Sequence, residues 1–365
     1  MSPDHAGRLA RAAEEAGGAG LDALIVAPSP DLVYLTGYDP PLLERLTALV
    51  VGPGREPVLL VPELERPRAA SEPVRDLARI ESWRDGEDPY EALSRLLAHG
   101  SRFGVSDRMW AVHLLGLERA LPGAAFSSGS AVLARLRARK DPEELHLLGR
   151  AGRAADEAFH RVLRLGFEGR TEREVAAELA RLLLETGHES VAFTIVASGP
   201  NAASPHHEPG ARTIRRGDVV VLDFGGRVGG YCSDITRTVC VGEPSEEVQE
   251  VHEVVARAQE AAFRAVRPGV PAGEVDRAAR RVVEESGYGG AFLHRTGHGI
   301  GLEEHEPPYI VEGNEEPLQP GMTFSIEPGV YLEGRFGVRI EDIVAVTEDG
   351  AVRLNHAPRE LVAVA

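Results

Sequence analysis

Short apolar runs alternate with helical segments in the first third of the chain. The runs Leu24 to Ala27, Thr47 to Val51 and Val58 to Pro62 have the length of buried strands, and Asp88 to His99 has the spacing of a helix. Residues 1–20 mix Arg and Glu with apolar positions, which predicts an amphipathic helix rather than a signal peptide. This alternation is typical of a small α/β domain.

A break in the hydrophobic periodicity separates this part from the rest of the chain. The pattern lapses around Arg135 to Asp141. Asp141, Pro142 and Glu144 then form a helix start with a cap, a proline at the first helical position and a capping-box glutamate. We therefore predict two domains, residues 1–135 and residues 136–365.

The second domain repeats its own pattern about a hundred residues later. Helices are predicted after Pro142 and after Ser245, and Glu174-Val175 matches Glu274-Val275. Further on, residues 217–225 match residues 321–329, so that Asp223 and Glu327 occupy the same position in the two copies. If the copies pack about a pseudo-two-fold axis, these acids face one site. A buried unpaired carboxylate costs several kcal/mol, so a positive group is expected between them.

Charge and composition exclude several classes of protein. The formal net charge of −17 disfavours a nucleic-acid partner, and no run approaches the roughly 20 apolar residues of a membrane span. Cys232 and Cys240 are the only cysteines, which favours buried thiols and a cytoplasmic location. Lys140 is the only lysine and has no glycine loop around it, so a phosphate-binding loop and a pyridoxal Schiff base are both excluded.

Four acids and one histidine of the second domain are candidate metal ligands. The set suits two divalent cations, because four carboxylates balance their four positive charges. Mn²⁺ is favoured, with Co²⁺, Zn²⁺ and Fe²⁺ as alternatives. Two such ions activate water for amide hydrolysis, and neither a G-x-S-x-G elbow nor an HExxH helix occurs in the sequence. The candidates are Asp223, Asp234, His298, Glu327 and Glu341.

The segments that contain these residues resemble a known family. LDFG, SDITRT, GHGIGLEEHE, SIEPGVY and GVRIED are similar to the successive signatures of the pita-bread metallopeptidases, from about Pro142 to Leu361. DLVYLTGY, from Asp31 to Tyr38, resembles the first domain of prolidases and aminopeptidases P. The resemblance implies an α/β (α+β) fold with a small creatinase/prolidase-like domain before a catalytic pita-bread domain. It also implies manganese and a homodimer.

The resemblance further implies a role for each matching residue. Asp223 would chelate one metal ion, Asp234 and Glu341 would bridge both, and His298 and Glu327 would complete the other. Glu327 would also shuttle a proton. His206 and His305 would position the substrate and stabilise the tetrahedral intermediate, although His207 is an alternative to its neighbour His206. Arg339 would hold a ligand carboxylate.

The implied substrate is a dipeptide or short peptide with proline in second position and a free N-terminal amine. A bond to proline is a tertiary amide without an N–H, which requires a dedicated pocket. A dipeptidase is slightly favoured over an aminopeptidase acting on longer peptides, and Arg45, in the loop from Gly37 to Leu46, is a candidate gate. The alternatives from other classes are a metal-free creatinase-like hydrolase and a non-catalytic binding scaffold.

Overall fold

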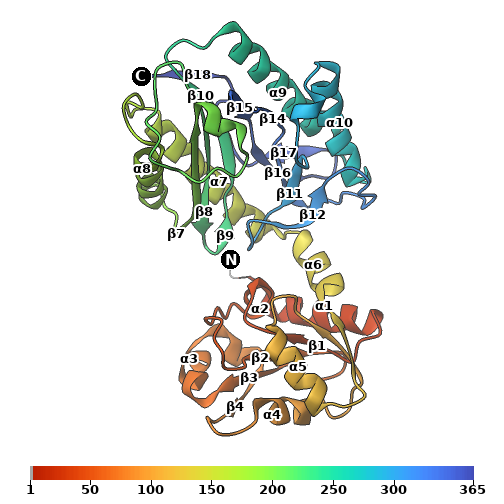
Figure 1. The fold of residues 1–365 in the computed structure, drawn as a ribbon. Helices are drawn as coiled ribbons and strands as arrows, with labels where there is room; N and C mark the ends of the chain where they lie inside the picture. Colours follow the sequence, from red (N-terminus) through yellow and green to blue (C-terminus); the bar gives the residue numbers. More distant parts are fainter. Residues whose placement is uncertain (1–2) are drawn as a thin grey trace. The chain divides into compact units, whose positions relative to one another are not determined.

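The computed structural model describes residues 3–365, which divide into two compact units (Figure 1). The first unit ends at Arg137 and the second begins at Ala138. The predicted domain boundary between residues 135 and 136 lies within helix α6, which continues to Ala138. Each unit has its own sheets and its own buried core.

The first unit is an α/β domain built on one six-stranded sheet in the order β4-β3-β2-β1-β5-β6. The central strand β1 pairs antiparallel with β2 and parallel with β5. The three predicted apolar runs form β1, β2 and β3. The strands are β1 (Ala23–Val26), β2 (Ala48–Val51), β3 (Val58–Pro62), β4 (Arg79–Trp83), β5 (Arg102–Val105) and β6 (Ala125–Ser128). The helices are α1 (His5–Gly18), α2 (Pro30–Thr36), α3 (Arg66–Ser71), α4 (Pro89–Leu96), α5 (Ala111–Ala120) and α6 (Ser130–Ala138).

The second unit begins with two helices that each start with a capping box, the first of them at the residues predicted from the sequence. The Asp141 side chain accepts from the backbone of Glu144, whose own carboxylate accepts from Asp141 N, and Thr171 and Glu174 form a second capping box. Ser245 caps the equivalent long helix of the second copy. These helices are α7 (Pro142–Val162), α8 (Glu172–Glu185), α9 (Glu246–Ala265) and α10 (Ala272–Glu285).

Each helix pair is followed by a sheet whose strands are antiparallel, except that β18 pairs in parallel with β10. In each sheet the strand that carries or precedes the predicted carboxylate lies in the middle. β8 lies between β7 and β10, and β13 lies between β11 and β16. Figure 1 shows α8 beside the first sheet and α10 beside the second. The first sheet contains β7 (Ser190–Ser198), β8 (Val219–Val228), β9 (Tyr231–Cys232), β10 (Ile235–Val241) and β18 (Val362–Val364). The second contains β11 (Gly297–Gly299), β12 (Glu306–Ile310), β13 (Thr323–Ile326), β16 (Asp342–Val346) and β17 (Ala351–Arg353), and a separate hairpin pairs β14 (Gly329–Leu332) with β15 (Phe336–Arg339).

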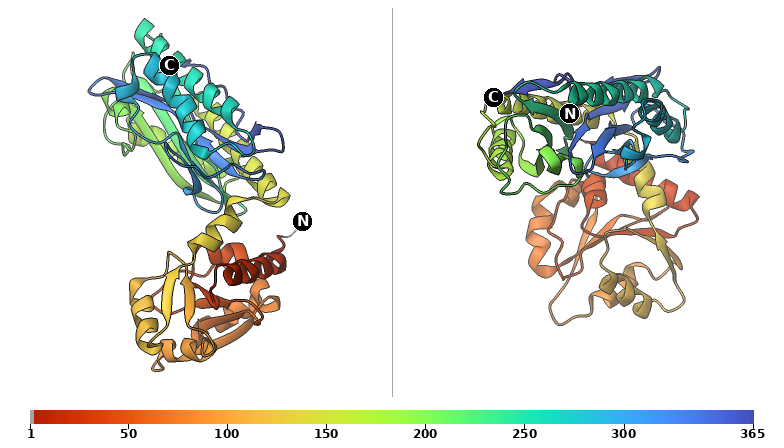
Figure 2. Two further views of the ribbon diagram at one scale, coloured as in Figure 1. Left: turned by 90° about the vertical axis from the view of Figure 1, so that its right-hand side faces the viewer. Right: turned by 45° about the horizontal axis from the view of Figure 1, so that its top comes forward.

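The internal repeat predicted from the sequence is thus present as two copies of a long helix, a shorter helix and a sheet. The second helix pair, α9 and α10, packs together, and the left view of Figure 2 shows these helices side by side. A bridge between Thr236 and Glu341 joins the two sheets. Gly229 and Gly230 have positive φ in the two-residue turn between β8 and β9, which join as a β-hairpin. None of the helices in residues 3–365 combines the length and the apolar character needed to cross a bilayer.

Candidate metal centre

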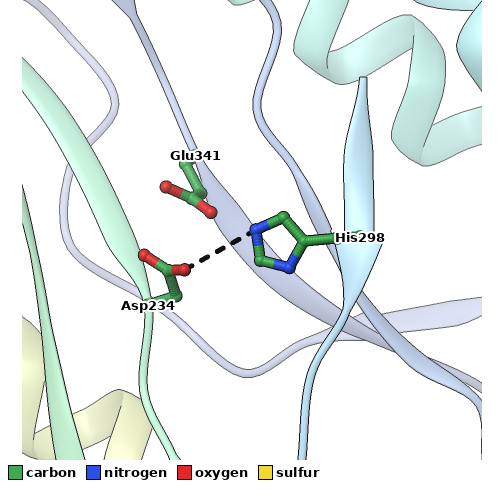
Figure 3. Close-up of side chains that lie close together, drawn as sticks. All are labelled: Asp234, His298 and Glu341. Atoms are coloured by element: carbon green, nitrogen blue, oxygen red, sulfur yellow. Dashed lines mark ion pairs between the residues drawn. The ribbon is translucent and has the colours of Figure 1, made fainter. Parts of the chain in front are cut away.

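Three buried side chains from separate strands converge at the junction of the two sheets. Asp234 directly precedes β10, His298 lies in the middle of β11, and Glu341 directly precedes β16. Ligand atoms of all three lie within 4.8 Å of one another. Figure 3 shows them pointing toward one another, with His298 Nε2 3.8 Å from Asp234 Oδ2. The backbone N–H of Glu341 donates to Thr236 O, which holds the starts of β10 and β16 together.

The other two predicted ligands lie beside this group. Glu327 directly follows β13, and its Oε1 is 3.2 Å from His298 Nε2. Asp223 lies on β8, and its Oδ2 accepts from Arg339 Nη2 at 2.6 Å. Asp223 pairs in register with Thr236 of β10, whose hydroxyl donates to Glu341 Oε2 at 2.7 Å. The fold therefore brings the five predicted ligands, drawn from residues 223 to 341, into one region.

The carboxylates of this region are buried without enough positive charge to balance them. Among the described residues, Asp223 Oδ1, Asp234 Oδ1 and Glu341 Oε1 are buried oxygens without a hydrogen-bond partner. Burial and the neighbouring carboxylates raise the pKa of Asp234 and of Glu341 well above the ordinary range. Such orphaned acceptors are rare in folded proteins and require an explanation. Divalent cations between them would supply the missing charge, so the residues present fit a metal centre.

The tautomer of His298 also fits a metal ligand. Its Nδ1 is 3.1 Å from Gly299 O, and since a carbonyl only accepts, Nδ1 carries the proton. The Nε2 lone pair then faces Asp234 and Glu327. Lone pairs and carboxylate oxygens at this distance repel unless a proton or a cation lies between them.

Arg339 is the main counter-charge within the protein itself. Its buried guanidinium donates to Asp223, to Thr236 Oγ1 at 3.1 Å and to the Tyr331 hydroxyl at 2.8 Å. Thr236 Oγ1 in turn donates to Glu341 Oε2 at 2.7 Å. Arg339 therefore holds one predicted ligand directly and a second through Thr236. Although burial raises the pKa of Glu327, the contacts with His298 and His294 and the charge of Arg339 lower it to about 2.

His305 lies against His298, with 3.8 Å between the ring centroids. Burial and the neighbouring imidazole lower the pKa of His305 to about 4, so it is neutral at pH 7. Arg295 Nη2 lies 3.5 Å from His305 Nδ1, which makes Nδ1 the acceptor and leaves the proton on Nε2.

The two adjacent histidines 206 and 207 have different surroundings. His207 Nε2 is bound to the buried carboxylate of Glu172 at 2.8 Å. His206 is exposed, and its neighbour Pro205 accepts from Arg339 Nη1 at 3.4 Å. The side chain of His207 is therefore engaged by Glu172, whereas the side chain of His206 is exposed.

His294 lies near the same centre and was not identified from the sequence. Its Nδ1 is 2.7 Å from Arg295 O and therefore carries the proton, so its Nε2 accepts from the Tyr331 hydroxyl at 2.8 Å. Burial lowers the pKa of His294, and charges that include Arg339 and His206 lower it further. Its position four residues before His298 in the same motif was the available signal.

The remaining histidines and cysteines of interest lie away from the centre. His188 Nδ1 donates to Leu183 O, and its Nε2 accepts from Ser233 Oγ at 2.8 Å, so it supports the residue before Asp234. His113 and His252 are buried on α5 and α9. Cys232 and Cys240 are buried free thiols, as predicted.

A duplicated domain whose halves each supply two buried carboxylates to one centre, with one imidazole, defines a class of metal-binding hydrolases. Comparison with known proteins agrees with this class. Residues 146–348 match the model of metallopeptidase family M24, and residues 8–139 match the creatinase/prolidase N-terminal domain. The chain belongs to metallopeptidase family M24. The predicted resemblance and the predicted fold class are therefore confirmed.

Three relatives illustrate the similarity. The chain is 48% identical over 363 residues to the probable dipeptidase PepE of Mycobacterium tuberculosis, covering 99% of this chain and 96% of that protein. It is 40% identical over 345 residues to the Xaa-Pro dipeptidase of Lactobacillus helveticus, covering 90% and 91%. The crystal structure of a prolidase from Thermococcus sibiricus is similar with a TM-score of 0.94 at 39% identity, and the match covers 100% of both chains.

Proposed function

We propose that this protein is a metal-dependent Xaa-Pro dipeptidase. The observation that carries the proposal is the buried centre in which three carboxylate oxygens have no partner among residues 3–365. Its position within a fold shared along the whole chain with a prolidase supports the same function. An aminopeptidase acting on longer peptides is the alternative within the same class.

The centre would hold two divalent cations through its four carboxylates and the Nε2 of His298. The oxygen-rich set favours Mn²⁺, with Co²⁺, Zn²⁺ and Fe²⁺ as alternatives. The residues that would bind the ions are Asp223, Asp234, His298, Glu327 and Glu341. When bound, such ions lower the pKa of water and polarise the carbonyl that it attacks.

The protein's own groups would then orient the substrate and move protons. Glu327 is ionised at neutral pH, because its pKa is about 2, so its carboxylate can bind a cation. We also assign the transfer of a proton to Glu327. Neutral His305 has an Nε2–H that can donate to a developing oxyanion, and exposed His206 can do the same. His294, held by Tyr331, adds a further imidazole on this side. Arg339 keeps Asp223 in place.

The choice between dipeptides and longer peptides remains a prediction. Proline specificity requires a pocket that accepts a tertiary amide, and dipeptide specificity requires recognition of the free carboxylate. Arg45 was the candidate gate, but its guanidinium already binds Asp85 with two hydrogen bonds of 2.9 and 3.0 Å and Glu44 at 2.7 Å. Replacing Arg45 with Ala tests this role: an unchanged preference between dipeptides and longer peptides would rule it out.

The test of the proposed function is hydrolysis of Ala-Pro and Ala-Pro-Ala by metal-stripped protein, with and without added Mn²⁺. We expect metal-dependent cleavage with a preference for Ala-Pro, and loss of cleavage in Asp234→Ala. Preferred cleavage of Ala-Pro-Ala would favour the aminopeptidase. If neither peptide is cleaved under any condition, the metal-free hydrolase and the binding scaffold become the better interpretations.

We further propose that the enzyme acts in the cytoplasm as a homodimer, without a nucleic-acid or membrane partner. The net charge of −17 and the two buried free thiols support this setting. Trp110, Val112 and Leu115 form an exposed apolar group on and before α5, which is a candidate subunit contact. Light scattering of the wild type and of Leu115→Glu tests it. A dimer unaffected by the substitution would place the contact elsewhere.

A further inference from the structure

A fully buried carboxylate outside the metal centre lies at the start of α8. Glu172 is 0% exposed. Its Oε1 accepts from Ser198 N at 2.8 Å, Ser198 Oγ at 2.7 Å and Asn201 Nδ2 at 3.0 Å. Its Oε2 accepts from His207 Nε2 at 2.8 Å and Gly210 N at 3.1 Å. One side chain therefore takes five hydrogen bonds, more than a helix start requires.

The five donors all belong to one segment, residues 198–210, which contains His206. Backbone bonds run beside them: Glu172 N donates to Arg212 O and Arg173 N donates to Gly210 O, both at 3.1 Å. On the other side of His206, Arg339 Nη1 donates to Pro205 O at 3.4 Å. His206 thus lies between Pro205, which is bound by Arg339 of the metal centre, and His207, which is bound by Glu172.

The carboxylate of Glu172 remains ionised in this environment. Burial raises its pKa, but the hydrogen bonds from His207, Ser198 and Asn201 outweigh burial and lower the pKa overall. The start of α8 also favours a negative charge. An ionised carboxylate can accept from five donors at once, whereas a neutral amide has a single acceptor oxygen. The anion is therefore suited to holding a loop in one conformation.

We propose that Glu172 is a positioning residue that fixes His206 toward the metal centre, acting through His207 and the segment 198–210. The inference rests on the proposed function, in which His206 meets the substrate. It also assigns the adjacent histidines separate tasks: His207 is the anchor and His206 is the reacting partner. The simpler interpretation is that Glu172 only stabilises the start of α8, and the two interpretations predict different kinetics.

The test is a double-mutant cycle of Glu172→Gln and His206→Ala on the metal-loaded enzyme. We expect Glu172→Gln to lower kcat about 10- to 100-fold, the range seen when an outer partner of an active-site group is lost, with little change in KM or metal content. In the His206→Ala background the same substitution should have no further effect on kcat. If Glu172→Gln lowers kcat equally in the wild type and in His206→Ala, the proposal is overturned. It is also overturned if the loss of kcat parallels a loss of bound metal.

Two further variants separate positioning from stability. Glu174→Gln removes the exposed capping-box partner on the same helix and should lower the melting temperature while kcat stays unchanged. His207→Ala breaks one bond to Glu172 and should reproduce the kcat loss even if Glu172→Gln fails to fold. Unchanged kcat in a folded His207→Ala enzyme contradicts the assigned anchor.

Hydrogen exchange provides a readout that does not depend on turnover. Backbone amides of residues 198–210 should exchange faster in Glu172→Gln than in the wild type, and Glu174→Gln should not show this change. If the wild type cleaves no Xaa-Pro peptide, the proposed function fails, and the exchange experiment still shows whether Glu172 anchors the segment. Unchanged exchange in Glu172→Gln overturns the inference whatever the activity.

Discussion

The two halves of the second unit share one plan for their carboxylates. Asp223 on β8 corresponds to Glu327 after β13, and Asp234 before β10 corresponds to Glu341 before β16. Each half supplies two acids from the same places in its sheet. A duplicated element thus supplies two matching pairs of carboxylates, an arrangement that suits the proposed centre for two similar cations.

The halves differ in how they supply histidine. β11 of the second half carries His298, whereas β7 of the first half contains no histidine. Each half also holds a histidine-containing segment with a buried acid on its second helix. On α8 this acid is Glu172, and on α10 it is Asp276, whose Oδ1 accepts from Thr296 N at 2.9 Å. These acids do not occupy equivalent positions in the repeat, so the two halves hold their histidine-containing segments in different ways.

The long helices differ in the same way. α7 buries Asp156, which accepts from the backbone of residues 356 and 357, and α9 buries His252. Burial raises the pKa of Asp156 and lowers that of His252 to about 4. The long helix therefore buries an acid in one half and a histidine in the other, although both halves place two carboxylates at the centre.

The largest expected effect tests the symmetry of the ligands. Asp234→Asn and Glu341→Gln each remove one ligand charge from opposite halves while preserving side-chain volume. We expect both to lower kcat by more than the roughly 100-fold cost of losing an outer-shell partner, with a matching loss of bound metal. Elemental analysis together with Ala-Pro hydrolysis measures both quantities. If only one of the two loses metal, the halves are not equivalent.

The next largest effect concerns the ion pair between the halves. Lys140, just before α7, donates to Glu306 of β12 at 2.6 Å, and both side chains are almost fully buried. Lys140→Met removes the ammonium from a buried carboxylate, and we expect a loss of about 3–5 kcal/mol in the free energy of unfolding. Urea denaturation measures it.

Arg181→Met is the matched control for this ion pair. Arg181 pairs with Glu178 and Glu185 on the exposed face of α8. Exposed pairs contribute less than about 1 kcal/mol, so this variant should unfold almost like the wild type. Similar losses in the two variants would mean that the link between the halves is no stronger than a surface pair.

A smaller effect depends on pH. The unfolded chain protonates His252 near pH 6.5, but the folded protein does so only near pH 4. Stability from this residue is therefore complete above pH 6.5 and is lost as the pH falls toward 4, by about 3 kcal/mol. His252 Nε2 has no hydrogen-bond partner in the described chain, so His252→Leu should remove most of this loss. Denaturation curves at pH 7 and pH 4.5 provide the measurement, and an unchanged difference between them would show that other groups cause it.

The smallest effect compares the starts of the long helices. α7 has a complete capping box at Asp141, whereas α9 has a single bond from Val248 N to Ser245 Oγ. We expect Asp141→Ala to cost about 1–2 kcal/mol and Ser245→Ala about 0.5–1 kcal/mol. Thermal unfolding of the two variants measures both losses. A larger decrease in melting temperature for Ser245→Ala than for Asp141→Ala would contradict this prediction.

Local pattern determined a large part of this protein. The capping residues and the apolar strands are recognised from residues close together in the sequence, and the repeat is recognised by comparing two such stretches. The two-domain architecture and the five candidate ligands could therefore be predicted without a structure. Asp223 and Glu327 were recognisable because they occupy matching positions of the repeat beside apolar runs, where a charge needs a reason. Asp234, His298 and Glu341 were recognisable from the motifs that contain them.

Tertiary structure alone decided which groups meet across long distances in the chain. Arg339 binds Asp223 rather than its near neighbour Glu341, and Glu172 binds His207, whereas the adjacent His206 is exposed. The connection of His294 to the centre is a hydrogen bond to the Tyr331 hydroxyl, which the sequence did not predict. Such partners are separated by 35 to 116 residues, and no local periodicity encodes them. Their pairing depends on how the two sheets and their helices pack, because a hydrogen bond forms only where the folded chain brings donor and acceptor within about 3 Å.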